Sequence, residues 1–346
     1  MRLAVYTPGD FKALERAVAP LGFETSLRHR QFVEHYYCRH PTCRLWTVRG
    51  DDGAILGTLG VERMRFQWSG REVIVGSGSN FHGFQRGVGG FLYREWLRAC
   101  DFALVFGGSH DAHRIYRQQR WHYFPDIHTY RLNPLYSARA SDGLWRRGAK
   151  WLLRRSVRTP LARLARRLSD IDVGDVHVRE ESAYTADLIP TRSPFTFRYV
   201  PTLDELAWRY SLDLSFVRYR LFRVLAGDRT VGYVVLNVDQ SRILVAHSDG
   251  EDPHELAIGT IMSVLEVGRP VRRPLLVVLA SSDPVMRAVF ERFGFRTPAQ
   301  GRPFAMHART SSTSLPTDPA GWLVNYDWGD NGLRPRVPVR PPPSGS

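Results

Sequence analysis

Residues 76–121 read GSGSNFHGFQRGVGG, then FLYREWLRAC, then DFALVFGGSHDAHRIYRQQRW, and this stretch decides the fold. It predicts the end of a strand, a glycine-rich turn and a helix, followed by a second apolar strand and a second helix. Gly87, Gly89 and Gly90 stand where the turn becomes the first helix. Glycines let an anion approach the backbone, and the N–H groups at a helix start carry partial positive charge. The stretch therefore predicts an anion site, with a diphosphate as the expected ligand, although glycines alone are also typical of an ordinary turn.

The composition is that of a globular protein long enough for two domains. The chain has 346 residues, of which 43% are hydrophobic and 24% charged. Its net charge of +14 comes almost wholly from arginine, because Lys12 and Lys150 are the only lysines. Such a charge suits nucleic acid, but no nucleic-acid-binding motif accompanies it, so a nucleic-acid partner is not expected. The three cysteines form no CxxC pair and the histidines are scattered, so no metal is expected.

The N-terminal sequence and the apolar runs predict where the protein is found. MRLAVYTPGDFKALERA, residues 1–17, has no apolar core long enough for a signal peptide. No run approaches the ~20 apolar residues needed to span a bilayer. We therefore expect a cytoplasmic protein.

Residues 1–136 predict a mixed α/β domain, in which antiparallel strands lead into a β-α-β unit at the glycine-rich turn. Strands are expected at 2–6, 45–48, 55–66, 72–76 and 102–106, helices at 11–18, 29–39, 90–99 and 109–119, and a closing strand at 123–132.

This order of elements resembles the GNAT superfamily of acyl-CoA-dependent N-acyltransferases. In that family a segment (Arg/Gln)-x-x-Gly-x-(Gly/Ala) follows the fourth strand and holds the pyrophosphate of CoA. Residues 84–89, FQRGVG, stand in its place: Gly87 and Gly89 match, and Phe84 departs from the usual Arg or Gln. The resemblance covers roughly residues 1–135 and rests on two segments at the right separation.

The second family segment has the form Asn-x-x-Ala-x-x-Leu-Tyr-x-x-x-Gly-Phe and corresponds to residues 109–121. Ala112 and Tyr116 match, whereas Ser109 and Arg120 depart. The resemblance implies acetyl-CoA, or another acyl-CoA, as co-substrate and no metal. The CoA-binding residues that it implies are Ser79, Phe81, Phe84, Gln85, Arg86, Gly87, Val88, Gly89, Gly90, Ser109 and Ala112.

Acyl transfer needs a proton for the departing thiolate and a free amine. Tyr116 lies where the family often places a tyrosine as the general acid, and the alternative is a packed helix aromatic. The candidates for a general base are His82, just before the glycine-rich turn, and Glu62, on the strand 55–66. Alternatively, His82 is a loop histidine without a role and Glu62 is a solvated strand carboxylate. A water chain can also replace a dedicated base.

Residues 137–170 predict a basic helical linker. They hold ten basic and two acidic residues, in two amphipathic segments, the second beginning at Thr159-Pro160. Two interpretations have equal weight. Residues 141–168 contact the surface of an anionic membrane, or the apolar faces of the two helices pack on the flanking domains. A nucleic-acid-binding arm is a weaker third interpretation.

Residues 171–330 resemble a diverged second copy of the same domain. Its match to the second family segment runs from Asp283 to Phe295, with Phe290 in place of the tyrosine and no glycine-rich turn before it. We therefore expect a degenerate copy that shapes the acceptor groove. A final strand is expected at 322–328, and residues 331–346, rich in Pro, Arg and Ser, predict a disordered tail.

The expected function is transfer of an acyl group, with acetyl favoured, from acyl-CoA to an amine at the first copy. The resemblance implies an amino sugar or a cell-envelope or polysaccharide precursor as acceptor. The basic linker fits a small-molecule or a lipid-linked acceptor, with the protein peripheral to the inner face of the membrane. Two alternatives stay open: FemAB-like aminoacyl transfer to an envelope precursor, and a non-catalytic acyl-CoA-binding or scaffold protein.

Overall fold

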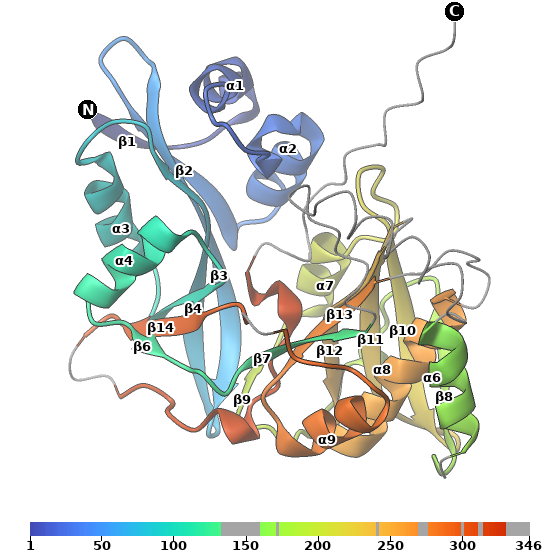
Figure 1. Ribbon diagram of the computed structural model, residues 1–346. Coiled ribbons are helices and arrows are strands. Elements are labelled where there is room, and N and C mark those ends of the chain that lie inside the picture. Colours follow the sequence, from blue (N-terminus) through green and yellow to red (C-terminus); the bar gives the residue numbers. More distant parts are fainter. Residues whose placement is uncertain are drawn as a thin grey trace, which may run out of the picture.

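The computed structural model describes residues 1–132, 160–170, 173–239, 242–268, 276–298, 301–310 and 314–329. These residues form two mixed sheets with helices against their faces (Figure 1). Most neighbouring strands in the two sheets are antiparallel, and each sheet has one parallel pair: β4 with β5, and β12 with β13. The predicted mixed α/β class with two similar domains in tandem is confirmed.

The first sheet, within the described residues, has the order β1-β2-β3-β4-β5-β14-β6, with β9 paired to β3. Helices α1 (Phe11–Val18) and α2 (Arg30–Cys38) cover one face, and α3 (Val88–Arg98) and α4 (His110–Gln118) cover the other (Figure 1). The strands are β1 (Arg2–Val5), β2 (Cys43–Arg49), β3 (Ile55–Trp68), β4 (Arg71–Gly83), β5 (Phe102–Phe106), β6 (His122–Tyr123), β9 (Phe197–Tyr199) and β14 (Phe304–Ala308).

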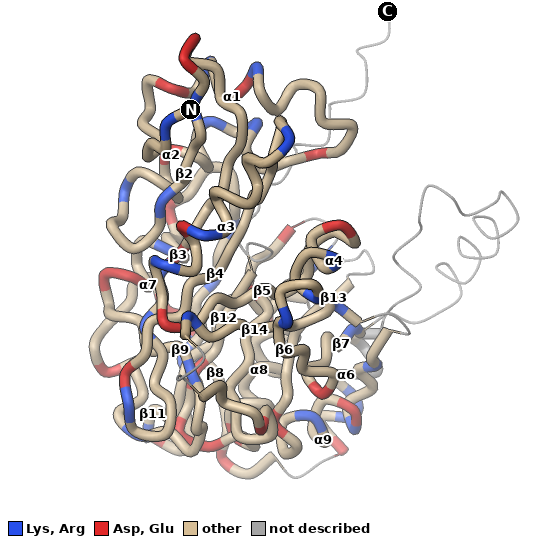
Figure 2. Tube along the Cα trace, turned by 90° about the vertical axis from the view of Figure 1, so that its left-hand side faces the viewer, with Lys and Arg blue, Asp and Glu red and all other residues tan. Residues whose placement is uncertain are grey.

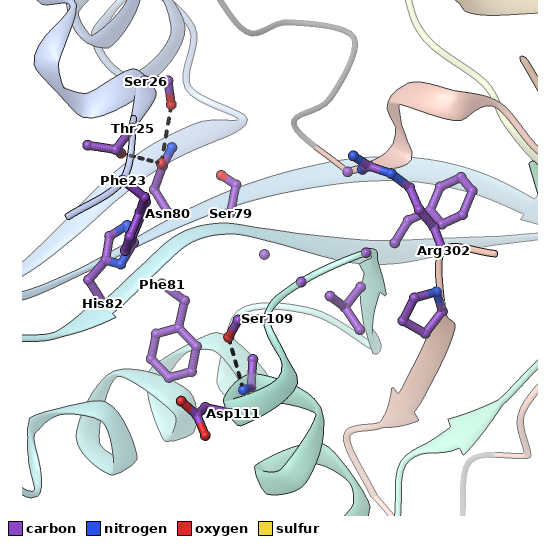
Figure 3. Close-up of a pocket in the computed structure, with 18 of the residues that line it drawn as sticks. Phe23, Thr25, Ser26, Ser79, Asn80, Phe81, His82, Ser109, Asp111 and Arg302 are labelled. Atoms are coloured by element: carbon purple, nitrogen blue, oxygen red, sulfur yellow. Dashed lines mark hydrogen bonds between the residues drawn. The ribbon is translucent and has the colours of Figure 1, made fainter. Parts of the chain in front are cut away.

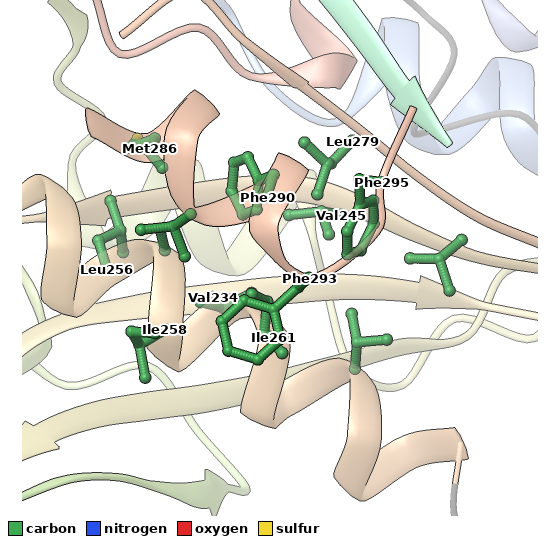
Figure 4. Packing of buried hydrophobic residues seen from close by; sticks show 14 of the residues in the cluster. Val234, Val245, Leu256, Ile258, Ile261, Leu279, Met286, Phe290, Phe293 and Phe295 are labelled. Atoms are coloured by element: carbon green, nitrogen blue, oxygen red, sulfur yellow. The ribbon is translucent and has the colours of Figure 1, made fainter. Parts of the chain in front are cut away.

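The second sheet has the order β7-β13-β12-β11-β10-β8 among the residues described. Figure 4 shows the apolar side chains of its helices, such as Leu256, Ile261 and Phe290, packed over the strand residues Val234 and Val245. The strands are β7 (His128–Leu132), β8 (Val176–Glu181), β10 (Tyr219–Ala226), β11 (Arg229–Val238), β12 (Arg242–Gly250) and β13 (Leu276–Ser281), and the helices are α6 (Pro160–Ser169), α7 (Leu203–Arg209), α8 (Pro253–Gly268) and α9 (Pro284–Arg292).

The two predicted domains, residues 1–136 (the first half) and 171–330 (the second half), exchange a strand. The expected single strand over 123–132 is wrong, because a turn at Pro125 divides it into β6 and β7. β7 crosses to the second sheet and pairs antiparallel with β13, where Tyr130 and Leu132 enter the core of the second half. In return β14, near the C-terminal end of the described chain, pairs with β5 and β6 of the first sheet. A boundary near residue 136 therefore does not separate the two sheets.

The segment 322–328 is not the strand that the sequence predicts. It makes an isolated bridge from Trp322 to Phe197 and contains a short 3-10 turn, Tyr326–Trp328. Trp322 and Trp328 are buried in a core between the two sheets, so this segment is an internal connection and not a sheet edge.

Helix α6 is the second helix that the sequence predicts in the basic linker. Its Leu161 and Leu164 are buried against the second half, and Leu161 packs so closely on α8 that a Cβ at Gly268 would lie 2.5 Å from its Cδ1. The apolar face of α6 is therefore used within the chain. The first linker helix and the tail at 331–346 lie outside the described residues.

Two properties of the described residues concern the membrane and nucleic-acid interpretations: how their charges are distributed, and how apolar their helices are. Figure 2 shows basic residues interspersed with acidic ones along the elements. No helix in the described ranges combines the length and the apolarity needed to cross a bilayer.

A buried ionic cluster joins the two halves. Arg209, at the end of α7, donates to the Glu62 carboxylate on β3, and its Nη2 donates to the main-chain oxygen of Asp327 at 2.8 Å. The hydroxyls of Tyr36 and Tyr210 donate to the carboxylates of Glu62 and Asp327 respectively. All five residues are less than 6% exposed. One guanidinium thus faces the two carboxyl groups of Glu62 and Asp327 in a dry interior.

The free energy of unfolding is expected to depend on the protonation of this cluster. Burial raises the pKa of Asp327 from 3.8 to about 6, against the opposing effect of Arg209. The folded state therefore holds this proton more tightly than the unfolded chain does. The resulting stability is fully present below the unfolded pKa and is lost as pH rises through about 6.

Urea unfolding at a series of pH values tests this effect. Asp327→Asn, which cannot titrate, should gain stability relative to the wild type as pH rises through about 6. Asp213→Asn, at an exposed position, should give a pH profile parallel to that of the wild type. A parallel profile for Asp327→Asn would contradict the prediction.

Candidate active site

The glycine-rich turn leads into a helix start that no side chain of the described residues caps. Gly87, the residue before α3, has φ of 86°, in the left-handed region that favours glycine, and it offers no side chain to the helix. Gln85, Arg86 and Gly90 are exposed around it. Helix geometry leaves the N–H groups of the first turn without partners inside the helix. The Val88 N–H donates to the Gln85 oxygen at 3.3 Å, and the next N–H groups of the first turn are the positively polarised donors that the sequence predicts for an anion site.

Next to this turn, β4 and β5 separate. Their parallel ladder pairs Val75 with Phe102 and ends at Ser77 with Leu104, although β4 continues to Gly83. Beyond Ser77, no strand within the described ranges pairs with the edge of β4 that faces β5, while its other edge stays bonded to β3. The two strands thus form a V-shaped opening at their carboxyl ends.

A cavity of about 1120 Å³ occupies this opening (Figure 3). Its walls come from both halves of the chain and from both faces of the first sheet. The lining residues are Leu21, Phe23–Ser26, Gly78–Phe84, Val105–Ser109, Asp111, Ala112, Tyr116, Arg131, Pro298, Gly301–Pro303 and Gly329. A cavity of this volume accommodates a ligand larger than most drug-sized molecules.

A bulge in β4 faces the cavity. The register with β3 shifts between Thr58 and Gly60, opposite Asn80, which has a positive φ of 48°. The side chain of Asn80 fixes the bulge, because its Nδ2 donates to Tyr37 Oη at 2.7 Å and its Oδ1 accepts from Ser26 Oγ at 3.2 Å. A bulge leaves backbone groups without their ladder hydrogen bonds. A non-glycine residue that is held in the left-handed region, as Asn80 is, is often part of a functional site.

Tyr116, on α4, has a buried ring and reaches the cavity wall. It is 3% exposed, and its ring centroid lies 4.5 Å from that of Trp121 and 6.2 Å from that of Trp96. Among the described residues, none forms a hydrogen bond with its hydroxyl. Burial raises the pKa of Tyr116, so the hydroxyl stays protonated at neutral pH and is available as a donor to a bound molecule. The sequence predicts either a packed aromatic or a general acid for Tyr116, and this geometry is compatible with both.

Several solved structures share this arrangement of strands and helices. The GCN5-related N-acetyltransferase of Kribbella flavida gives a TM-score of 0.52 at 16% identity, over 89% of this chain and 72% of its own. The GCN5-related N-acetyltransferase of Anabaena variabilis gives 0.52 at 8% identity, over 89% and 73%. A conserved Enterococcus faecalis protein of unknown function gives 0.54 at 9% identity, over 88% and 71%.

The chain has the GNAT fold. No family model matches the sequence, and no curated relative matches it. The resemblance predicted from the two sequence segments is thus confirmed by three-dimensional structure at very low sequence identity. This likeness establishes the fold.

The two base candidates have different surroundings in the GNAT fold. His82, on β4, lines the cavity, with its ring 5.8 Å from Phe23 and 6.0 Å from Phe84. Glu62 is 3% exposed, does not line the cavity, and accepts from Arg209 and Tyr36. The interpretation of Glu62 as a general base is therefore corrected: its carboxylate belongs to the buried ionic cluster. His82 stays the candidate base.

The predicted CoA-binding residues fall into three groups. Those that line the cavity are Ser79, Phe81, Phe84, Ser109 and Ala112. Those in the turn and at the helix start beside it are Gln85, Arg86, Gly87, Gly89 and Gly90. Val88 is fully buried beneath the turn, where it packs so closely that a Cβ at Gly57 would lie 2.5 Å from its Cγ1. The side chain of Val88 therefore supports the turn and cannot itself contact a ligand.

Several lining residues were not predicted. Phe23, Thr25 and Ser26 come from the connection between α1 and α2, and Arg131 and Arg302 come from the exchanged strand β7 and the segment before β14. Thr25 accepts from the N–H of Leu27, so a helix-capping pattern marks its position, but not its place at the cavity. The two arginines carry no local signal, since the strand exchange brings them to the site.

The equivalent opening in the second half is filled by the chain itself. The ladder between β12 and β13 also ends early, at Leu244 with Val278. Beyond it Asn325 Oδ1 accepts from the Ser248 N–H at 2.8 Å, and Asn325 Nδ2 donates to the Ser248 oxygen at 3.0 Å. The segment 322–328 thus bonds to β12 where β4 has a free edge.

The helix that corresponds to α3 is also closed to an anion. At the start of α8, Asp252 Oδ1 accepts from the N–H groups of His254 and Glu255, at 2.8 and 2.9 Å. A carboxylate of the chain therefore occupies the position that an anionic ligand would take. Phe290, in the place of Tyr116, is 1% exposed and has no hydroxyl. The first half alone combines an open strand edge, an uncapped helix and a tyrosine, within the described residues.

Proposed function

We propose that the protein transfers an acyl group, with acetyl favoured, from acyl-CoA to an amine. The transfer takes place at the opening between β4 and β5 in the N-terminal half. One observation carries this proposal: the free edge of β4 and Tyr116 line the same cavity, and the uncapped start of α3 lies directly after the lining residue Phe84. The filled opening of the second half supports it, because the same fold there lacks all three features.

Each feature matches one part of the co-substrate. The pyrophosphate would bind the N–H groups at the start of α3 beside Gly87, where the helix dipole favours an anion. The two amide groups of the pantetheine arm would bond to the free edge of β4, in the manner of an added strand. This path brings the thioester to the bulge at Asn80 and to Tyr116.

The chain's own groups supply the proton transfers. The acceptor nitrogen attacks the thioester carbon, so that a C–N bond forms, and the C–S bond then breaks. The Tyr116 hydroxyl donates its proton to the departing sulfur, while His82, or water in the cavity, accepts the proton that the amine loses. The proton taken from the amine returns to the tyrosinate through solvent, so the protein ends unchanged.

Binding of acetyl-CoA should raise the melting temperature, and Gly89→Glu should abolish that rise. A ligand at ~100 times its Kd adds about 2.7 kcal/mol to the free energy of unfolding. A glutamate at Gly89 places a carboxylate where the pyrophosphate would bind, while a negative side chain in the first turn does not weaken the helix.

Gly89→Ala is the matched control. A Cβ at this position would lie 3.8 Å from Phe81, an ordinary contact, so alanine fits and should keep the shift. Differential scanning fluorimetry with acetyl-CoA and longer acyl-CoAs provides the measurement. A wild type that no acyl-CoA stabilises, or a Gly89→Glu variant that is stabilised as well as the wild type, contradicts the proposal.

The acceptor class is a separate proposal. An amino sugar or an envelope or polysaccharide precursor, small or lipid-linked, is supported by the resemblance stated from the sequence. Peripheral contact with an anionic membrane through residues 141–168 would depend mainly on the first linker helix, because the leucines of α6 pack on the second half.

A further inference from the structure

Two arginines without carboxylate partners among the described residues line the cavity. Arg302, in the segment before β14, and Arg131, on β7, both line it and are half-buried. Arg131 Nε is buried without a hydrogen-bond partner. In the part of the chain that the structure describes, neither arginine forms an ion pair. A half-buried cation without a partner costs free energy, which a bound anion would offset.

Arg302 is held in place by its neighbours. Its guanidinium carbon lies 5.2 Å from the centroid of the Tyr326 ring, and that ring packs on Phe106 at 6.0 Å. Gly107, with φ of 97°, leaves the space beside it open, because a Cβ there would lie 3.1 Å from Arg302 Nη1. The arginine is therefore pre-oriented and lies against a residue without a side chain.

Arg302 lies on the opposite face of the sheet from the predicted pyrophosphate site. Side chains of β5 alternate: Ala103 and Val105 pack with α3 and α4, whereas Leu104 and Phe106 pack with Tyr326 in the core between the sheets. Since Arg302 stacks on Tyr326, it belongs to the second of these faces. The anion that it would bind is thus not the pyrophosphate at the start of α3.

The other end of the cavity is different in character. Figure 3 shows Arg302 across the cavity from Asn80, Thr25 and Ser26, which form a hydrogen-bonded group. The acidic lining residues are Glu24 and Asp111, both exposed. A molecule in this space would therefore meet hydroxyl and amide groups at one end and positive charge at the other.

We propose that the acceptor amine carries an oxyanion, a carboxylate or a phosphate, which Arg302 binds while Arg131 adds positive charge. This proposal rests on the proposed acyl transfer and specifies its substrate. A guanidinium offers parallel N–H donors that match the paired oxygens of a carboxylate or phosphate. The anion end of the acceptor would sit at Arg302, and its amine would point toward the thioester near Asn80.

Matched acceptors that differ only in the anion test the proposal. One series is glucosamine, its 6-phosphate and the corresponding uronic acid, and another is ethanolamine, O-phosphoethanolamine and glycine. With the full chain and saturating acetyl-CoA, thiol release gives kcat/KM for each. At least one anionic member should exceed its neutral relative by about 10- to 100-fold. Comparison of phosphate with carboxylate members identifies the anion.

Variants show whether Arg302 is responsible. Arg302→Met should reduce the preference to within a factor of about three while retaining the acetyl-CoA melting shift, and Arg302→Lys should restore part of it. Arg309→Met, at an exposed site just after β14, is the control and should leave the preference unchanged.

Each remaining outcome overturns the proposal. Equal rates within each series, transfer to neutral members only, or a preference that survives in Arg302→Met would refute the anion site while the acyltransferase proposal stands. An intact acetyl-CoA melting shift with no transfer to any anionic acceptor would likewise refute the anion site alone. Loss of the shift together with loss of transfer to every amine would refute both proposals.

Discussion

Tyr116→Phe is expected to slow acyl transfer by about 10²- to 10⁴-fold, the usual range for loss of a positioned acid, with acetyl-CoA affinity nearly unchanged. The substitution removes only a hydroxyl that has no protein partner among the described residues, and it keeps the ring packed against Trp121 and Trp96. The departing thiolate then has to take its proton from water. Single-turnover thiol release and the acetyl-CoA melting shift separate chemistry from binding.

The control for this prediction is Tyr93→Phe. Tyr93 lies in the same aromatic cluster, but its hydroxyl accepts from Trp121 Nε1 at 2.6 Å and does not line the cavity. Its loss should leave the transfer rate close to that of the wild type. A Tyr116→Phe enzyme with the wild-type rate would remove Tyr116 from the mechanism.

Arg209→Met is expected to lower the free energy of unfolding by about 3–5 kcal/mol, the range for breaking a buried ion pair from one side. The substitution leaves the carboxylates of Glu62 and Asp327 buried without their cation. Equilibrium urea unfolding measures the loss. Because the three residues come from β3, α7 and the C-terminal segment, the same change also weakens the contact between the two halves.

Two further variants keep this prediction testable if Arg209→Met does not fold. Glu62→Gln removes one of the two competing charges and should cost less than Arg209→Met. Arg229→Met, which breaks an ion pair with Glu251 at a side chain 58% exposed, should have little effect. Equal losses for Arg209→Met and Arg229→Met would contradict the role of the cluster.

Local sequence patterns predicted the features that depend on local structure. The glycine-rich turn, the helix after it and the position of Tyr116 follow from residues within one stretch, 76–121, and the structure brings them to one opening. The degenerate second copy was predicted in the same way, from Phe290 and the missing glycine-rich turn. The structure shows the physical form of that difference, since Asp252 caps the helix.

Features that depend on distant parts of the chain could not be predicted. Glu62 was a plausible base because its sequence neighbours do not reveal Arg209, which only the fold brings into contact. The exchange of β7 and β14 has no pattern of its own, since an alternating strand fits either sheet equally well. Arg302 is one of 48 basic residues, and its place at the cavity depends on that exchange.

The structure gives the second half a direct part in the site. It supplies β14 beside β5, and the segments that carry Arg302 and Gly329 to the cavity wall. Its own opening is filled by the segment 322–328, which also reaches the first half, where Ser77 Oγ donates to the Trp328 oxygen. The second half thus completes the first sheet and borders the end of the cavity at Arg302.

Hydrogen–deuterium exchange with and without acetyl-CoA tests most directly whether the first half binds the co-substrate. We expect slower exchange in peptides that cover residues 78–90, where β4 has a free edge and α3 an uncapped start, and no change over 245–256 in the second half. Slower exchange over 245–256 instead, or no change in either region at saturating acetyl-CoA, would contradict it.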